Sequence, residues 1–196
     1  MKKKSFAIIG DPIAHSLSPI LHNYWFDKYN INAEYNLLNI KEGDLQLVVS
    51  DIKEKKLSGI NITLPYKQKI IPYVDQLIND AKLTNSVNTV FINDKNTLVG
   101  ENTDVFGIQA AYLKEIPNIE NKKILIMGAG GVSPSVILSL QKSKVSNISI
   151  VNRTYEKSIF LKKKFNFLNV LSWGSFQKEI RNFDIIVNAT SLGLKG

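Results

Sequence analysis

The sequence predicts an α/β protein made of two domains, and three observations lead to this prediction. Short apolar segments with strand character alternate with helical segments along most of the 196 residues. A glycine-rich loop at residues 128–131 joins one such strand to a helix. A polar, turn-forming stretch at residues 117–123, "PNIENKK", interrupts the pattern, which then begins again. We therefore expect one α/β domain over residues 1–116 and a second over residues 117–196.

The first domain opens with a β-α-β-α-β pattern. Residues 5–10, 33–40 and 58–65 have the composition of strands, and residues 43–55 have the spacing of a helix. Farther along we expect helical stretches at 67–84, a strand at 86–93, a turn at 93–96, and a segment at 97–104 that leads into a helix at 105–116.

A further helix is expected between the first two strands. Ser18 is placed as its N-cap, with Pro19 at the first helical position. Helical spacing predicts that this helix has a buried face, which consists of Leu21, Tyr24, Trp25 and Tyr29. More generally, we expect the tyrosines and tryptophans of the chain in the core.

The second domain repeats the alternation. Strands are expected in "KKILIMGAGG", "SNISIVNRT", "NVLS" and "FDIIVNATSLG", and helices in "SPSVILSLQKS" and "YEKSIFLKKKF". Nearly continuous apolar strands that alternate with helices are typical of parallel sheets covered on both faces, and we expect this in both halves.

Composition excludes several classes of protein. Hydrophobic residues make up 44% and charged residues 21%, which is typical of a globular protein and not of a disordered or fibrous one. The absence of cysteine excludes disulfides and thiol nucleophiles, and with only two histidines, expected to be structural, we expect no metal site. The apolar run at residues 6–9 is too short for a signal peptide or a membrane span.

The formal net charge of +8 would suit nucleic acid, a membrane surface or small anions. Most lysines are scattered, and no basic stripe is interleaved with aromatic residues. We therefore expect small anionic ligands, with no nucleic acid or membrane partner, and a location in the cytoplasm.

The glycine-rich loop predicts a dinucleotide site. Gly128, Gly130 and Gly131 permit a tight turn and close approach of a pyrophosphate to the following helix N-terminus. The spacing departs from G-x-G-x-x-G because Ser133 occupies the third position, and a glycine turn of any doubly wound domain is the alternative.

The end of the next strand favours NADP as the cofactor. A site for NAD usually has Asp or Glu there, whereas this chain has Asn152, Arg153 and Thr154. A guanidinium and a hydroxyl suit a 2′-phosphate. The alternative is an ordinary surface arginine at a strand end.

Polar side chains in the first domain follow strand ends or turns and could converge on one cleft. They are Ser16, Ser18, Asn61, Thr63, Lys67, Asn88, Asn102 and Asp104. This set suits a small polyhydroxylated ligand, and Lys67 beside Asp104 could exchange the proton that accompanies hydride transfer. The alternatives are that Ser18 and Asp104 only cap helices and that Lys67 is a solvated lysine.

The chain resembles the shikimate dehydrogenase family over essentially its whole length. The motifs "GDPIAHSLSPILHN", "GINITLPYK", "SVNTV", "GENTDVFG", "GAGGV", "NRT" and "NATSLG" occur in that family's order and approximate spacing. The resemblance implies an α/β substrate-binding domain followed by a Rossmann-type NADP-binding domain. It also implies reversible NADPH-dependent reduction of 3-dehydroshikimate to shikimate, in chorismate and aromatic amino acid biosynthesis, by a monomer or homodimer.

The resemblance also implies roles for individual residues. Ser16 and Ser18 would hold the substrate carboxylate, and Lys67 would be the catalytic acid/base paired with Asp104. Thr63, Asn88 and Asp104 would bind ring hydroxyls. The cofactor would be bound by Gly128, Ala129, Gly130, Gly131 and Val132, by Asn152, Arg153, Thr154, Tyr155, Glu156 and Lys157, and by Thr190 and Ser191 on the nicotinamide side.

The chain departs from the family pattern at two places. Asn85 and Ser86 stand where the family usually has Gly-Ala before Val-Asn-Thr. The sequence also stops at Gly196, whereas the family continues with the rest of the nucleotide domain and a helical segment that carries a substrate-binding Gln, so we expect a C-terminally truncated form. The rival interpretations are a quinate/shikimate dehydrogenase that uses NAD and a non-catalytic fragment that binds shikimate or nucleotide.

Overall fold

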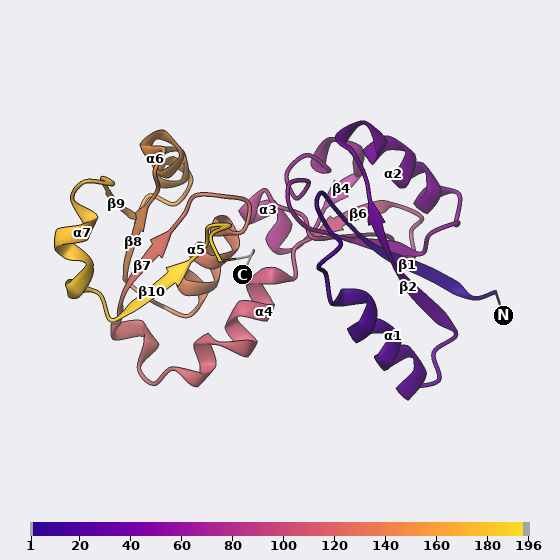
Figure 1. The fold of residues 1–196 in the computed structure, drawn as a ribbon, viewed down its shortest axis with the longest axis horizontal. Helices are drawn as coiled ribbons and strands as arrows, with labels where there is room; N and C mark the ends of the chain where they lie inside the picture. Colours follow the sequence, from indigo (N-terminus) through magenta and orange to yellow (C-terminus); the bar gives the residue numbers. More distant parts are fainter. Residues whose placement is uncertain (1, 194–196) are drawn as a thin grey trace. The chain divides into compact units, whose positions relative to one another are not determined.

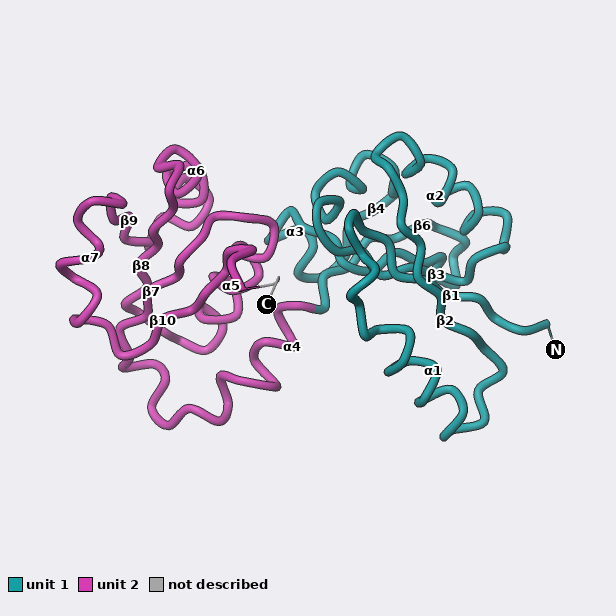
Figure 2. The backbone as a smooth tube through the Cα atoms, in the orientation of Figure 1, with its two compact units in different colours: residues 1–103 teal, residues 104–196 magenta. Residues whose placement is uncertain are grey.

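The computed structural model describes residues 2–193 and confirms the α/β fold class. The chain divides into two compact units, residues 1–103 and 104–196 (Figure 2). This division falls earlier than the boundary expected after residue 116, because α4 (Asp104–Ala111) packs against α5 (Ser133–Lys142) of the second unit. Buried Val105 accordingly belongs to the hydrophobic core of that unit.

The first unit contains a six-stranded sheet with the order β2-β1-β3-β5-β6-β4. Its strands β1, β2 and β3 are parallel, as the β-α-β-α-β pattern predicts. The strands are β1 (Lys4–Gly10), β2 (Ala33–Asn39), β3 (Gly59–Ile62), β4 (Gln76–Leu77), β5 (Thr89–Ile92) and β6 (Leu98–Glu101). The helices are α1 (Ser18–Lys28), α2 (Leu45–Lys53, after a 3-10 turn at Glu42–Asp44) and α3 (Asp80–Thr84).

The expectation of an all-parallel sheet is wrong for the first unit, since β5 runs antiparallel to both β3 and β6. A tight turn joins β5 to β6, which only antiparallel neighbours allow. The Asn93 side-chain oxygen accepts hydrogen bonds from the backbone N–H groups of Lys95 and Thr97, both at 3.0 Å. The reversal brings the beginning of β5 to the edge where β3 ends.

Alternate residues of β1 pack on opposite faces of the sheet. Ala7 and Ile9 belong to the larger core, to which α2 contributes Val48, Val49 and Ile52. Phe6 and Ile8 pack on the other face in a smaller cluster that includes Phe26 of α1. Helices α1 and α2 therefore cover opposite faces of this sheet, as Figure 1 shows.

Helix α1 differs from its prediction in two respects. Its N-cap is Leu17 and not Ser18, which is already helical, with Pro19 close behind. The expected buried face is also wrong, since no residue of α1 is buried and most of its large apolar residues are exposed. The exposed residues on and beside the helix are Leu17, Ile20, Leu21, Tyr24, Trp25 and Tyr29.

The helical stretches expected at residues 67–84 are mostly absent. The chain there forms a 3-10 turn (Ile71–Tyr73), the short strand β4 and the short helix α3. Pro72 within this segment prevents a continuous α-helix. Helix α3 is followed by its C-cap Asn85, which has a left-handed φ of 52°. This is the position where the family that the sequence resembles usually has glycine, which adopts this conformation readily.

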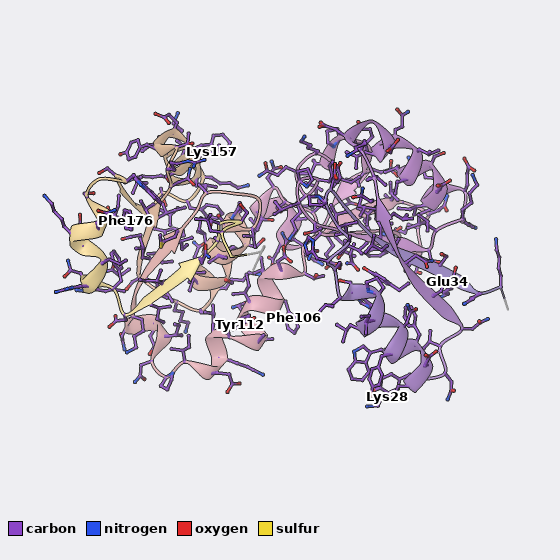
Figure 3. All side chains as sticks on the ribbon, viewed as in Figure 1. Lys28, Glu34, Phe106, Tyr112, Lys157 and Phe176 are labelled. Atoms are coloured by element: carbon purple, nitrogen blue, oxygen red, sulfur yellow. The ribbon has the colours of Figure 1, made fainter. Side chains whose placement is uncertain are left out.

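Within the described residues, the second unit contains a four-stranded sheet with the order β10-β7-β8-β9. Its strands are parallel, as expected. Its strands are β7 (Lys123–Met127), β8 (Asn147–Val151), β9 (Asn169–Leu171) and β10 (Ile185–Asn188). Besides α4 and α5, its helices are α6 (Tyr155–Lys164) and α7 (Phe176–Glu179), with 3-10 turns at Leu113–Glu115, Ile119–Asn121 and Ile180–Asn182. Phe176 of α7, labelled in Figure 3, packs with Leu125 and Val151 in a smaller core.

Among residues 2–193, no helix has the length and apolar character needed to cross a membrane.

Candidate active site

Three predicted site residues of the first unit lie at one edge of its sheet. The backbone N–H of Thr63 donates to Ile9 O at 3.0 Å, which ties the end of β3 to the end of β1. The N–H of Val87 donates to Lys67 O at 2.8 Å, and Asn88 O accepts from the N–H of Ile62 at 2.8 Å. The structure thus brings the backbones of Thr63, Lys67 and Asn88 together.

Gly10 lets the chain after β1 pass close to the same edge. A Cβ at Gly10 would lie 2.7 Å from Cγ2 of Thr63 and 3.0 Å from Leu64 O. Because glycine lacks that carbon, the next residue, Asp11, can donate its N–H to Leu64 O at 3.1 Å. The segment that carries Ser16 and Ser18 therefore starts against the end of β3.

Ser16 and Ser18 are both half-buried and form the entrance to α1. The Ser16 hydroxyl oxygen accepts a hydrogen bond from the N–H of Ser18 at 3.3 Å. The side chain that hydrogen-bonds to the backbone at the start of this helix is therefore that of Ser16 and not that of Ser18. Ser18 lines an open groove of about 560 Å³ on α1, together with Leu17, Ile20, Leu21 and Tyr24. Ser18 is therefore not used as a helix cap.

The side chain of Asn88 is fixed by Thr103. Asn88 Oδ1 accepts from the N–H of Thr103 at 3.0 Å, and Asn88 Nδ2 lies 2.9 Å from Thr103 Oγ1. We did not predict a role for Thr103 from the sequence, although it stands in "NTD" between two residues that we did select.

Two other amides of the predicted set have structural partners. Buried Asn102 donates to Ser86 O at 2.9 Å and to Thr84 Oγ1 at 3.2 Å, which holds the end of α3. Asn61 lies within the sheet, where its Nδ2 donates to Thr89 Oγ1 at 3.1 Å. These contacts connect elements of the first unit.

Lys67 and Asp104 belong to different units. Lys67 is half-buried in the turn after β3, and Asp104 is the half-buried first residue of α4. Their pairing stays a prediction from the sequence.

In the second unit, the glycine loop requires glycine at its first position. Gly128 has a φ of 115°, and a Cβ there would lie 2.8 Å from the backbone of Ala189. Ser133 explains the departure from the usual spacing, because its buried hydroxyl donates to Gly128 O and accepts from the N–H of Gly130, both at 3.0 Å. A serine side chain thus closes the turn at the start of α5.

Asn152 connects the glycine loop to the loop after β8. Its Oδ1 accepts from the N–H of Ala129 at 3.1 Å, and its Nδ2 donates to Thr154 O at 2.8 Å. Arg153 and Thr154 beside it are exposed, as is Lys157 on the first turn of α6 (Figure 3). Two cationic side chains therefore lie in or next to the loop that Asn152 holds against the glycines.

Thr190 lies next to the glycine loop. A Cβ on Gly128 would be 3.0 Å from its Cγ2, and its hydroxyl donates to Asn188 Oδ1 at 2.7 Å. Ser191 follows it and is exposed. The structure thus brings Thr190 to the same end of the sheet as Gly128.

These residues fit a dinucleotide phosphate. A Cβ at Gly131 would meet no atom within 4 Å, and one at Gly130 would meet only Ala189 O at 3.9 Å, so the outer side of the loop is open. The N-terminus of the ten-residue helix α5 stabilises negative charge there, and the Arg153 guanidinium suits a second phosphate.

A mixed α/β unit with polar residues at one sheet edge, followed by a parallel α/β unit with this phosphate loop, defines the class of two-domain proteins with a Rossmann-type dinucleotide-binding unit. Residues 8–90 match the shikimate dehydrogenase substrate binding domain family, and residues 111–193 match the shikimate / quinate 5-dehydrogenase family. The chain belongs to the shikimate dehydrogenase family.

Individual relatives agree with this assignment. The chain is 45% identical to shikimate dehydrogenase (NADP(+)) of Pelagibacter ubique, over 98% of this chain and 71% of the relative. The crystal structure of shikimate dehydrogenase from Aquifex aeolicus has a TM-score of 0.90 at 37% identity and covers 98% of this chain, which spans 71% of it. Shikimate 5-dehydrogenase from Thermus thermophilus, in complex with NADP(H) and shikimate, has a TM-score of 0.85 at 28% identity, over 97% of this chain and 70% of that one.

Proposed function

We propose that this chain catalyses the reversible NADPH-dependent reduction of 3-dehydroshikimate to shikimate. The observation that carries the proposal is the 45% identity, over 98% of the chain, to a relative named shikimate dehydrogenase (NADP(+)). The open glycine loop followed by Arg153 in place of an acidic residue supports the choice of NADP.

The reaction needs a hydride and a proton. When bound, NADPH would supply the hydride for the carbonyl carbon at C3 of the substrate. Lys67 donates a proton to the oxygen that becomes a hydroxyl, and in the reverse direction it accepts that proton. In this proposal, the carboxylate of Asp104 pairs with the side-chain amine of Lys67.

The substrate residues follow from the same proposal. Ser16 and Ser18 hold the substrate carboxylate, while Thr63, Asn88 and Asp104 bind its ring hydroxyls. Support comes from the sheet edge, where backbone hydrogen bonds hold Thr63, Lys67 and Asn88 together.

The cofactor residues lie on the second unit. Residues 128–132 bind the pyrophosphate against the start of α5, and residues 152–157 bind the 2′-phosphate. Thr190 and Ser191 contribute to the nicotinamide side. We place the enzyme in the cytoplasm, because a sequence without cysteine suits a reducing compartment. We propose that it is a monomer or a homodimer.

The test is an assay of NADP reduction by the purified chain with shikimate, followed by nicotinamide absorbance, with quinate and NAD as parallel substitutions. We expect turnover with shikimate and NADP. Turnover only with quinate or with NAD would contradict the proposed specificity. Binding of shikimate without turnover would contradict the proposed activity and favour a binding-only form.

A further inference from the structure

A chain of hydrogen bonds crosses the first sheet from β2 to the candidate substrate site. It begins at Tyr35, which is 4% exposed and whose hydroxyl donates to Asn61 Oδ1 at 2.7 Å. Asn61 Nδ2 donates to Thr89 Oγ1 at 3.1 Å, and the Thr89 hydroxyl donates to Asn88 Oδ1 at 3.0 Å. Two side chains, those of Asn61 and Thr89, thus connect Tyr35 on β2 to Asn88.

Backbone groups fix the direction of this chain. Asn61 Nδ2 also lies 3.2 Å from Asn88 O, a carbonyl that can only accept, so the Asn61 oxygen must face Tyr35. At the other end, the N–H of Thr103 can only donate, so Asn88 must present Oδ1 to it. The Tyr35 hydroxyl therefore acts as the donor at the head of the chain.

Tyr35 is held firmly enough to serve this purpose. The Asn23 side chain pairs with both backbone polar groups of Tyr35, at 2.9 Å each. The His22 ring stacks on the Tyr35 ring with centroids 4.2 Å apart and planes 9° from parallel. Burial raises the pKa of Tyr35, which keeps its hydroxyl protonated and able to donate.

We propose that Tyr35 is a positioning residue for the substrate site, which acts through Asn61 and Thr89, and alongside the hydrogen bonds from Thr103, to hold the Asn88 amide in its present orientation. The proposal rests on the proposed function, in which Asn88 binds a ring hydroxyl of the substrate. Without the Tyr35 hydroxyl, Asn61 Oδ1 loses its donor within the sheet, and the orientation of Asn61 then depends only on the hydrogen bonds of its Nδ2 to Asn88 O and Thr89 Oγ1.

The first experiment records the side-chain amide resonances of Asn88 in ¹⁵N-labelled chain, without ligand and without turnover. Tyr35→Phe removes only the hydroxyl and should shift these resonances. Tyr66→Phe is the matched control, because it also removes one buried hydroxyl, which donates to a backbone carbonyl, Ile40 O, at 2.8 Å. Unchanged Asn88 resonances in Tyr35→Phe, or equal shifts in both variants, would overturn the proposal.

The second experiment measures steady-state kinetics. Tyr35→Phe should raise KM for shikimate about 3- to 10-fold, the usual effect of one lost hydrogen bond, with little change in KM for NADP. Thr89→Val breaks the chain of hydrogen bonds at a second element and should raise KM for shikimate in the same way. Thr89→Ser keeps the hydroxyl, so its KM for shikimate should stay within about twofold of the parent value.

The two experiments separate the two proposals. An unmodified chain that does not turn over shikimate would defeat the proposed function, and the Asn88 resonances would still decide whether Tyr35 orients Asn88. An active chain whose KM for shikimate is unchanged in both Tyr35→Phe and Thr89→Val would overturn the positioning role alone.

Discussion

Lys67 is the residue on which the proposed chemistry depends most directly. Its backbone is fixed to Val87 beside Asn88, which places it in the turn at the candidate site. Lys67→Ala should lower kcat by ~10²- to 10⁴-fold, the usual contribution of a general acid/base, with little change in KM for shikimate. Lys69→Ala is the control, since Lys69 lies in the same segment and pairs with Glu42. A kcat that survives in Lys67→Ala would show that another group carries the proton.

Arg153 determines the cofactor preference in our proposal. A guanidinium contributes charge-assisted hydrogen bonds to a 2′-phosphate that NAD lacks. Arg153→Ala should therefore raise KM for NADP about 10-fold or more and change KM for NAD much less. The other arginine, Arg181, is exposed in a 3-10 turn of the same unit and provides the matched variant. Equal effects of Arg153→Ala on both cofactors would remove it from the 2′-phosphate site.

The sequence could indicate candidate site residues that stand at strand ends, because strand ends are visible as breaks in apolar runs. Thr63, Lys67 and Asn88 were accessible in this way. The contacts of Tyr35, Asn61 and Thr89 were not, since they depend on strand order and on the antiparallel register that places Asn61 opposite Thr89. Side chains that meet across a sheet are set by such long-range pairing, which one sequence does not encode locally.

At the scale of elements, α1 shows what helical periodicity can and cannot predict. Its spacing correctly indicated a helix, but an apolar stripe does not establish that anything covers it. Within the described residues, α1 is attached to its sheet mainly through His22, Asn23 and Phe26 rather than through Tyr24, Trp25 and Tyr29. Two of the three attaching residues are polar, so a search for apolar faces misses them.

The docking of α1 should depend on pH through His22. Burial against Tyr35 lowers the pKa of His22 below its usual value of 6.5. The unfolded chain therefore binds this proton more readily, and the contribution of His22 is present above pH 6.5 and is lost as pH falls toward the lowered pKa. The free energy of unfolding, measured by urea titration from pH 7.5 to pH 5, should decline less in His22→Gln than in the parent.

His15→Gln, which removes the other histidine, is the control and should retain the decline attributed to His22. An identical pH dependence in His22→Gln and in the parent would show that the stacked imidazole does not titrate differently on folding.

Helix α6 contains a buried hydroxyl that should reduce stability. Ser158 is fully buried, and its hydroxyl has no hydrogen-bond partner among residues 2–193. Ser158→Ala removes the unsatisfied group and inserts a stronger helix former, so it should raise the free energy of unfolding by about 1 kcal/mol. Ser139→Ala is the contrasting variant, because the Ser139 hydroxyl donates to Val136 O at 2.8 Å. A loss of stability in Ser158→Ala would indicate a partner for this hydroxyl.

At the scale of the whole molecule, the alternation of strands and helices was enough to predict two α/β units. The division between them was harder, because a break in sequence pattern at residues 117–123 is not the point where the packing changes. Helix α4 precedes that break and yet contributes Val105 to the core of the second unit. Loop composition indicates where elements end, whereas long-range contacts decide to which core they belong.

Each unit has its own hydrophobic core, so each proposed ligand should stabilise mainly the unit that supplies most of its binding residues. A ligand at 100 times its Kd raises the free energy of unfolding of the unit that binds it by about 2.7 kcal/mol. The chain has one tryptophan in each unit, Trp25 in α1 and Trp173 in the second unit, which gives two local fluorescence probes. In Trp173→Phe, shikimate should raise the urea midpoint that Trp25 reports more than NADP does. In Trp25→Phe, NADP should have the larger effect on the midpoint that Trp173 reports. Equal shifts of both probes with either ligand would show that the two units unfold as one cooperative structure, in which binding to either stabilises both.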